Sequence, residues 1–201
     1  MPTDTFFVEF EQRVLDLEAK FLQDELAKEI EDALCYESDT DMLAAYRMLA
    51  HAELEDYLER KARAELAALE ANILASGSMT SDPRIYVLAN HFDLRIPHEC
   101  PFDDNRLKAA TKMVVEAARD FLAENNGVKQ RTLVAVALIC GKSIDSIDAS
   151  LCGALDSFGK ERGEVAHKSA KRVTTIRAPS DEKTSVTEIV TAIKRFFYPD
   201  A

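Results

Sequence analysis

The chain has 201 residues, of which 47% are hydrophobic and 30% charged, and its formal net charge at pH 7 is −11. This length and composition are typical of a folded globular domain and exclude a disordered chain. No apolar run approaches the roughly 18 residues of a membrane span, and the N-terminus lacks the basic-then-apolar order of a signal peptide. The four cysteines are widely spaced, as is usual for free thiols in a reducing compartment, so we expect a cytoplasmic protein with no membrane partner.

Acidic and basic residues are distributed unevenly along the chain. Residues 1–75 hold 19 Asp and Glu against 7 Lys and Arg, a balance of −12, whereas residues 76–201 hold 17 against 18, a balance of +1. Within residues 160–177 there are six basic and two acidic side chains. The net charge argues against nonspecific nucleic-acid binding by the whole surface. The basic segment fits a local phosphate-binding cleft and, equally, a solvated helix end.

The first third of the chain has the pattern of two long helices. Residues 3–76 contain neither Gly nor Pro, so nothing local interrupts a helix there. Apolar residues at spacings of three and four predict one amphipathic helix through Phe7, Phe10, Val14, Leu17, Phe21, Leu26, Ile30 and Leu34. Residues 38–40 offer N-cap oxygens for a second helix over 41–75, which Gly77 can end. Two long helices with a short connection predict an antiparallel hairpin.

Residues 76–102 form the irregular part of the sequence. They hold three prolines, and residues 85–88 are their only strand-like run. We expect an ordered excursion over the bundle, not a separate domain. His91, His98 and Cys100 are three candidate zinc ligands without a clear fourth, so we expect no metal.

Helical patterns resume at about residue 103 and continue to the C-terminus. A helix ended by residues 125–127 is followed by a very apolar segment, 129–140, for which strand is the alternative to helix. Ser143 is a candidate cap for the next helix, residues 178–181 are predicted to be a loop, and a capping box at 185–188 opens the last helix. The prediction is an all-α fold in one domain, 1–201, with long antiparallel helices followed by shorter C-terminal ones.

Arg162 and His167 carry the chemistry of interest. Histidine exchanges protons near neutral pH, and arginine presents a planar, permanently charged donor fork that suits phosphate oxygens. Together they supply a proton-transfer group and an oxyanion stabiliser. On one regular helix the two would lie about 140° apart and would not share a face. Because Gly159 is predicted to break the preceding helix, we expect the pair at a helix–helix turn.

The segment Arg162-Gly163-Glu164-Val165-Ala166-His167 resembles the Arg-x(4–6)-His signature of the HEPN superfamily. Residues 141–158 lead into it as in that family, and residues 45–58 are similar to a long helix of HEPN proteins of the RiboL-PSP and MAE type. The resemblance implies a HEPN-like helical-bundle homodimer in which the motifs of two protomers face one another. Many members are metal-independent endoribonucleases of toxin, antiviral-defence or RNA-processing systems, and some are noncatalytic. Gly163 stands where active members often have Asn, Asp or His, and Lys168 and Ser169 stand where several have an aromatic residue.

The resemblance implies that Arg162 and His167 are catalytic. His167 would act as general acid or base and Arg162 would bind the scissile phosphate, with RNA as partner and no cofactor. A cognate antitoxin or regulatory protein is a further expected partner. The basic residues nearby are candidates for substrate binding: Lys160, Lys168, Lys171 and Arg172.

Two residues of the second helix are candidates for orienting Arg162. Glu55 could pair with the guanidinium, but the sequence favours an exposed acidic helix face for it. His51 is expected to be a packed or capped histidine, and lining the cleft is the alternative. For the whole protein, the alternatives to a ribonuclease are a noncatalytic HEPN-like module that binds RNA, a nucleotide or a partner protein, and a helical dimerisation protein.

Overall fold

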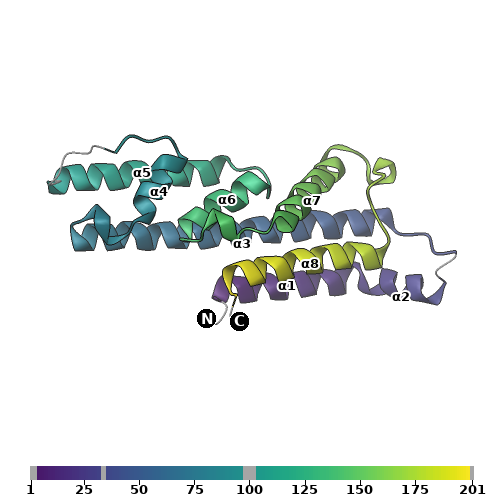
Figure 1. The fold of residues 1–201 in the computed structure, drawn as a ribbon. Helices are drawn as coiled ribbons and strands as arrows, with labels where there is room; N and C mark the ends of the chain where they lie inside the picture. Colours follow the sequence, from purple (N-terminus) through teal and green to yellow (C-terminus); the bar gives the residue numbers. More distant parts are fainter. Residues whose placement is uncertain (1–3, 33–34, 97–102, 200–201) are drawn as a thin grey trace. The chain divides into compact units, whose positions relative to one another are not determined.

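The computed structural model describes residues 4–32, 35–96 and 103–199. Within these ranges the regular structure is entirely helical, without a β-strand, which confirms the all-α prediction (Figure 1). The helices differ from the predicted ones mainly in where they begin and end.

The N-terminal amphipathic segment forms two helices instead of one. α1 spans Thr5–Phe21 and α2 spans Gln23–Glu31, with Leu22 between them. The Leu22 side chain is fully buried, whereas Ile30, a member of the predicted stripe, is 84% exposed. No Gly or Pro marks this break, so local sequence does not explain it, and the packing of α2 against α8 accompanies it.

Buried Glu25 of α2 ties the following connection to the fold. Its carboxylate accepts hydrogen bonds from Lys28 Nζ at 2.7 Å, from the Tyr36 hydroxyl and from the backbone N–H of Asp39 at 2.9 Å. Burial alone would raise the pKa of Glu25, but these hydrogen bonds outweigh it and lower the pKa to about 2.

The long helix α3, Thr40–Ser76, confirms the second predicted helix. The strand-like run at 85–88 is helical instead and belongs to α4, Arg84–His91, whose first turn follows Pro83. Proline fixes φ near the helical value and lacks an N–H that the first turn leaves unpaired anyway, so it suits this position. Residues 97–102 of the predicted irregular segment lie outside the described residues.

The next two helices agree with the helical pattern. α5 spans Asp104–Glu124, and the Asp103 side chain caps it by accepting a hydrogen bond from the Arg106 N–H at 2.8 Å. The apolar segment for which strand was the alternative is α6, Gln130–Ile139. Seven of its ten side chains are buried, on more than one face of the helix, which explains why its sequence shows no clear amphipathic period.

The C-terminal helices begin at other residues than predicted. Ser143 precedes only a short 3₁₀ turn, and α7 spans Ala149–His167 with Asp148 as its cap. α8 spans Pro179–Phe197, so the predicted loop at 178–181 is mostly helical and the capping box at 185–188 lies inside the helix. Pro179 occupies the first turn, and Asp181 and Glu182 place negative charge near the positive end of the helix dipole.

Residues 1–57, 127–130 and 147–201 form one compact unit. In it α1 packs on α2 and α8, α2 packs on α8, and α7 packs on α8. Its core includes an aromatic cluster in which Phe10 stacks on Tyr57 at 5.2 Å and Phe7 meets Tyr57 edge-on at 5.4 Å. Burying each such ring contributes about 2–3 kcal/mol, so this cluster is a main source of the unit's stability.

Residues 58–126 and 131–146 form the second compact unit, built from the end of α3 with α4, α5 and α6. Arg84, the first residue of α4, connects several parts of this unit. The guanidinium donates to Asp82, to Glu65 Oε2 at 3.0 Å and to the Ile139 carbonyl at 3.1 Å. These bonds link the start of α4 to α3 and to the end of α6.

Candidate functional site

The Arg/His motif lies within α7, which is continuous from Ala149 to His167. The predicted break at Gly159 is therefore wrong. A Cβ at Gly159 would lie 2.9 Å from the Val128 carbonyl oxygen, a separation that real Cβ atoms essentially never show. Gly159 therefore allows α7 to pack closely against the backbone of residue 128. The fold requires glycine here because it lacks a side chain, not because its backbone is flexible.

The continuous helix separates the two motif side chains. Arg162 and His167 are five residues apart, which places them about 140° apart around the helix axis, so they do not share a face of one chain. His167 is the last residue of α7 and is exposed, and the Arg162 side chain is 32% exposed. Lys160 and Gly163 lie seven and four residues before His167, and therefore on its side of the helix.

Arg162 faces the carboxylate of Glu55 on α3. Its Nη2 lies 4.0 Å from Glu55 Oε2, which is an ion pair but too long for a hydrogen bond. Glu55 also accepts a hydrogen bond from the backbone N–H of Gly127. Gly127 has φ +100°, a conformation that favours glycine, so the turn that presents this N–H depends on that residue. This geometry agrees with the pairing of Glu55 with Arg162. The favoured interpretation, an exposed acidic face, is wrong for Glu55, because its side chain is only 18% exposed.

His51 is a packed histidine, as the sequence predicts, and the alternative that it lines the cleft is wrong. Its side chain is fully buried, its ring lies 5.3 Å from that of Phe158, and Nε2 accepts a hydrogen bond from the Val128 N–H at 3.4 Å. Burial, and secondarily the charge of Arg162, lower the pKa of His51 to about 4. The ring is therefore neutral at pH 7. Its Nδ1 has no hydrogen-bond partner and lies 3.8 Å from Glu55 Oε2.

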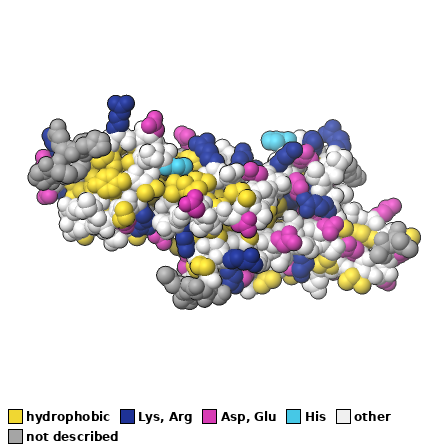
Figure 2. All heavy atoms as spheres, in the orientation of Figure 1, with side chains coloured by type: hydrophobic (Ala, Val, Ile, Leu, Met, Phe, Trp, Pro, Cys, Tyr) yellow, Lys and Arg dark blue, Asp and Glu magenta, His cyan; other side chains and the backbone are white. Residues whose placement is uncertain are grey.

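Three of the four candidate RNA-binding residues are exposed. Lys160 lies on α7, Lys168 follows it, and Arg172 ends a short 3₁₀ turn. Lys168 Nζ is 3.9 Å from Glu164, a solvent-exposed pair that leaves the ammonium accessible. The side chain of Lys171 lies outside the described residues. On the face drawn in Figure 2, lysine and arginine side chains gather over α7 and the segment after it, interspersed with acidic ones.

A buried ion network lies beside the motif, and sequence analysis did not find it. Arg47 of α3 is fully buried and binds both carboxylate oxygens of Glu182 on α8. It also donates to Thr175, through Nη1 to the hydroxyl at 3.1 Å and through Nη2 to the carbonyl at 2.7 Å. The network therefore holds the segment after α7 between α3 and α8.

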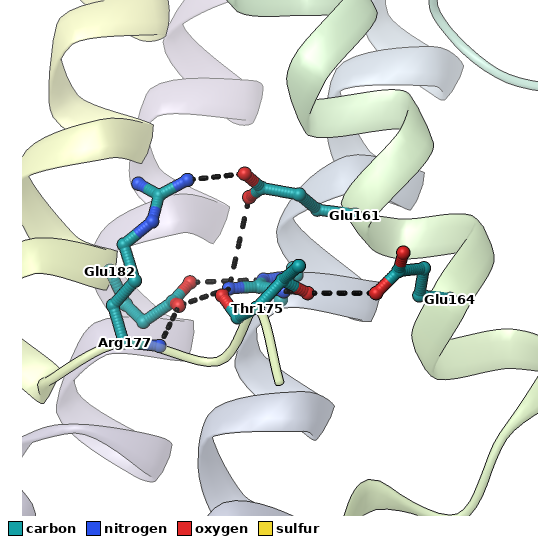
Figure 3. A network of polar contacts seen from close by, with 6 residues as sticks. Glu161, Glu164, Thr175, Arg177 and Glu182 are labelled. Carbon is teal, nitrogen blue, oxygen red and sulfur yellow. Dashed lines mark hydrogen bonds and ion pairs between the residues drawn. The ribbon is translucent and has the colours of Figure 1, made fainter. Parts of the chain in front are cut away.

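Two glutamates of α7 face this network: Glu161, directly before the motif, and Glu164 within it (Figure 3). Glu161 Oε2 lies 3.8 Å from Arg47 Nη2, its other oxygen pairs with Arg177, and Glu164 accepts a hydrogen bond from the Thr175 hydroxyl at 3.3 Å. A sequence signal existed, because position 47 is in register with the buried apolar residues of α3, where a charge requires a partner. The identity of that partner, 135 residues away, had no local signal.

The described residues hold no cluster of three His, Cys, Asp or Glu side chains suited to a metal. Of the three zinc candidates, only His91 is described, while His98 and Cys100 lie outside the described residues. No helix among the described residues is long and apolar enough to cross a membrane.

Comparison with known proteins finds no matching family model, no matching curated protein and no matching solved structure. The resemblance to HEPN proteins therefore rests on the motif, on residues 45–58 and on the helical setting.

Proposed function

We propose that the protein is a cytoplasmic, metal-independent endoribonuclease of the HEPN type, active as a homodimer, with Arg162 and His167 as catalytic residues. The observation that carries the proposal is the position of His167. Its imidazole is exposed at the end of α7, next to exposed Lys168 and on the same side of the helix as Lys160. The other two described histidines, His51 and His91, have pKa values lowered by burial and nearby arginines, whereas the exposed imidazole of His167 is accessible to a bound substrate.

The separation of Arg162 from His167 around α7 is the reason for proposing a dimer. One chain does not bring the two groups to one point, but a two-fold axis next to α7 would place Arg162 of one protomer across from the partner's His167. Such an arrangement supplies two imidazoles and two guanidinium groups to one cleft.

Two imidazoles match the proton requirements of RNA cleavage by internal attack. One His167 removes the proton of the ribose 2′-hydroxyl, and the 2′-oxygen then bonds to phosphorus. The bond from phosphorus to the 5′-oxygen breaks, and the partner's His167 protonates that oxygen. Arg162 stabilises the negative charge that develops on the phosphoryl oxygens. The products are a 2′,3′-cyclic phosphate and a free 5′-hydroxyl, and no redox step or water is needed.

Lys160, Lys168, Lys171 and Arg172 are proposed to bind the flanking phosphates. Neutralising phosphates with lysine and arginine releases counterions, so RNA affinity should fall steeply as salt concentration rises. The network around Arg47 supports this role, because it fixes the segment that follows Lys168, Lys171 and Arg172.

A second candidate function is a noncatalytic HEPN-like module that binds RNA, a nucleotide or a partner protein. The observation that favours it is the Glu55 carboxylate 4.0 Å from Arg162, which partly neutralises the cation that would meet the scissile phosphate. Gly163 also lacks the polar side chain that often follows the arginine in active members.

The deciding experiment is incubation of the purified protein with mixed RNA in EDTA, with end-group analysis of the fragments. We expect fragments ending in cyclic phosphate, reduced to a small residual level in Arg162→Ala and in His167→Ala. Two controls should cleave like the wild type. Ser157→Ala changes an exposed residue of the same helix, and Arg119→Ala removes an exposed arginine that pairs with Glu70. RNA binding without cleavage would favour the noncatalytic module, and unimpaired cleavage by His167→Ala would refute the assignment.

A toxin or antiviral-defence role is part of the same proposal. Expression in a bacterial host is expected to arrest growth, and His167→Ala is expected to abolish the arrest. A cognate antitoxin or regulatory protein would then be identified as a factor that restores growth when co-expressed and that blocks RNA cleavage by the purified enzyme.

A further inference from the structure

The Glu55 carboxylate lies near two nitrogen-bearing side chains, one charged and part-exposed, the other neutral and buried. Its Oε2 lies 4.0 Å from Nη2 of Arg162 and 3.8 Å from Nδ1 of fully buried His51. Its other oxygen, Oε1, accepts the N–H of Gly127. The carboxylate is thus anchored to the backbone of the 127–128 turn, while its second oxygen faces both side chains.

The orientation of His51 is consistent with a donor directed at this carboxylate. Because Nε2 accepts the Val128 N–H, the proton of the neutral ring resides on Nδ1. That Nδ1–H is buried and has no hydrogen-bond partner. A buried donor without an acceptor is unfavourable, and a shift of Glu55 Oε2 toward it by several tenths of an ångström would complete a hydrogen bond.

We infer that Glu55 is a positioning residue that directs the Arg162 guanidinium toward the substrate phosphate, with His51 and the Gly127 N–H holding the carboxylate in place. The inference rests on the proposed function. Glu55 engages Arg162 through Nη2, and the Arg162 side chain is 32% exposed, so the remaining N–H donors of its guanidinium are available to phosphate oxygens. Side-chain pairs of this kind are often long in the free enzyme and shorten when substrate binds.

A positioning role and a competing role of Glu55 predict different kinetics. A carboxylate that merely competes with phosphate for Arg162 weakens RNA binding, so its removal would lower KM and leave kcat unchanged. A positioning carboxylate acts on the transition state, so its removal lowers kcat without raising KM. A purely structural role would instead lower thermal stability and reduce the amount of active protein.

The variant for this test is Glu55→Gln, because glutamine loses the charge but keeps an oxygen that can accept the Gly127 N–H. The matched control is Glu53→Gln on the same helix, which makes the same chemical change beside Arg13 at 3.1 Å. We expect kcat for RNA cleavage to fall about fivefold in Glu55→Gln, the factor for one part-exposed ion pair, and to stay unchanged in Glu53→Gln. Glu55→Asp, which keeps the charge, should recover part of the loss.

The dependence on Arg162 is tested by a double-mutant cycle. In an Arg162→Ala background, Glu55→Gln should have no further effect on residual cleavage, because the group it positions is absent. An unchanged kcat in Glu55→Gln, or the same fivefold loss in both backgrounds, would overturn the inference.

A measurement without RNA separates this inference from the proposed function. Nitrogen-15 relaxation of the Arg162 Nε–H reports how ordered the guanidinium is in the free protein. We expect restricted motion in the wild type and in Glu53→Gln, and increased motion in Glu55→Gln. Equal mobility in all three proteins would overturn the positioning role even if the protein cleaves RNA. Increased mobility in Glu55→Gln alone would support it even if cleavage is absent.

Discussion

Gly159 and Gly163 lie one turn apart in α7, and alanine at the two positions should change stability in opposite directions. A Cβ at Gly163 meets no atom within 4 Å, whereas a Cβ at Gly159 lies 2.9 Å from the Val128 carbonyl oxygen. That oxygen belongs to the backbone, which yields less readily than the end of a flexible side chain. Both positions are inside a helix, where glycine is unfavourable by roughly 0.5–1 kcal/mol relative to alanine.

The magnitudes follow from these two terms. Gly163→Ala gains only the helix term and should stabilise the protein by about 0.5–1 kcal/mol. Gly159→Ala gains the same term but adds overpacking of about 1–3 kcal/mol, so it should be destabilising. The helix term cancels between the variants, and their difference in unfolding free energy, about 1–3 kcal/mol, isolates the close approach of α7 to residue 128.

Urea unfolding followed by far-UV circular dichroism measures this difference, provided that the m-values of the two variants agree. In thermal unfolding, 1 kcal/mol corresponds to a Tm shift of about 2–4 °C for a chain of this size. If Gly159→Ala proves as stable as Gly163→Ala, α7 does not lie against Val128, and the packing described for His51 and Glu55 is wrong as well.

Two further predictions concern buried charges. Arg47→Met leaves the Glu182 carboxylate buried without its cation and should lower the unfolding free energy by about 3–5 kcal/mol in urea titrations; a loss below 1 kcal/mol would contradict a buried pair. Burial, with the charge of Arg162, lowers the pKa of His51 to about 4, below the value near 6.5 of an unfolded chain, so the unfolded state binds the proton first as pH falls. The His51 contribution should be complete above pH 6.5 and should decline by up to about 3 kcal/mol between pH 6.5 and 4. His51→Gln should remove this decline in urea titrations at pH 7.5 and 5, and an identical pH dependence of both proteins would refute it.

The amino-acid sequence by itself determined the helical class and the longest helices. The absence of Gly and Pro from residues 3–76 and the regular apolar spacing suffice for α3, and the apolar period from about residue 103 suffices for α5. These helices depend on local propensity and on one amphipathic face, and both are determined by residues close together in the sequence. The burial of His51 was likewise open to sequence analysis, because it follows from the helical register of α3. For Glu55 the sequence offered Arg162 as a partner only beside the interpretation of an exposed acidic face.

Only the tertiary structure decided where helices end and which distant charges meet. Glycine is a common residue at helix ends, yet Gly159 lies inside α7. In a local stretch of sequence, a glycine that ends a helix cannot be told from one that permits close packing. The break at Leu22 and the pairing of Arg47 with Glu182 depend in the same way on partners far along the chain. Close approach and burial are properties of surfaces that come together only on folding, so no local pattern encodes them.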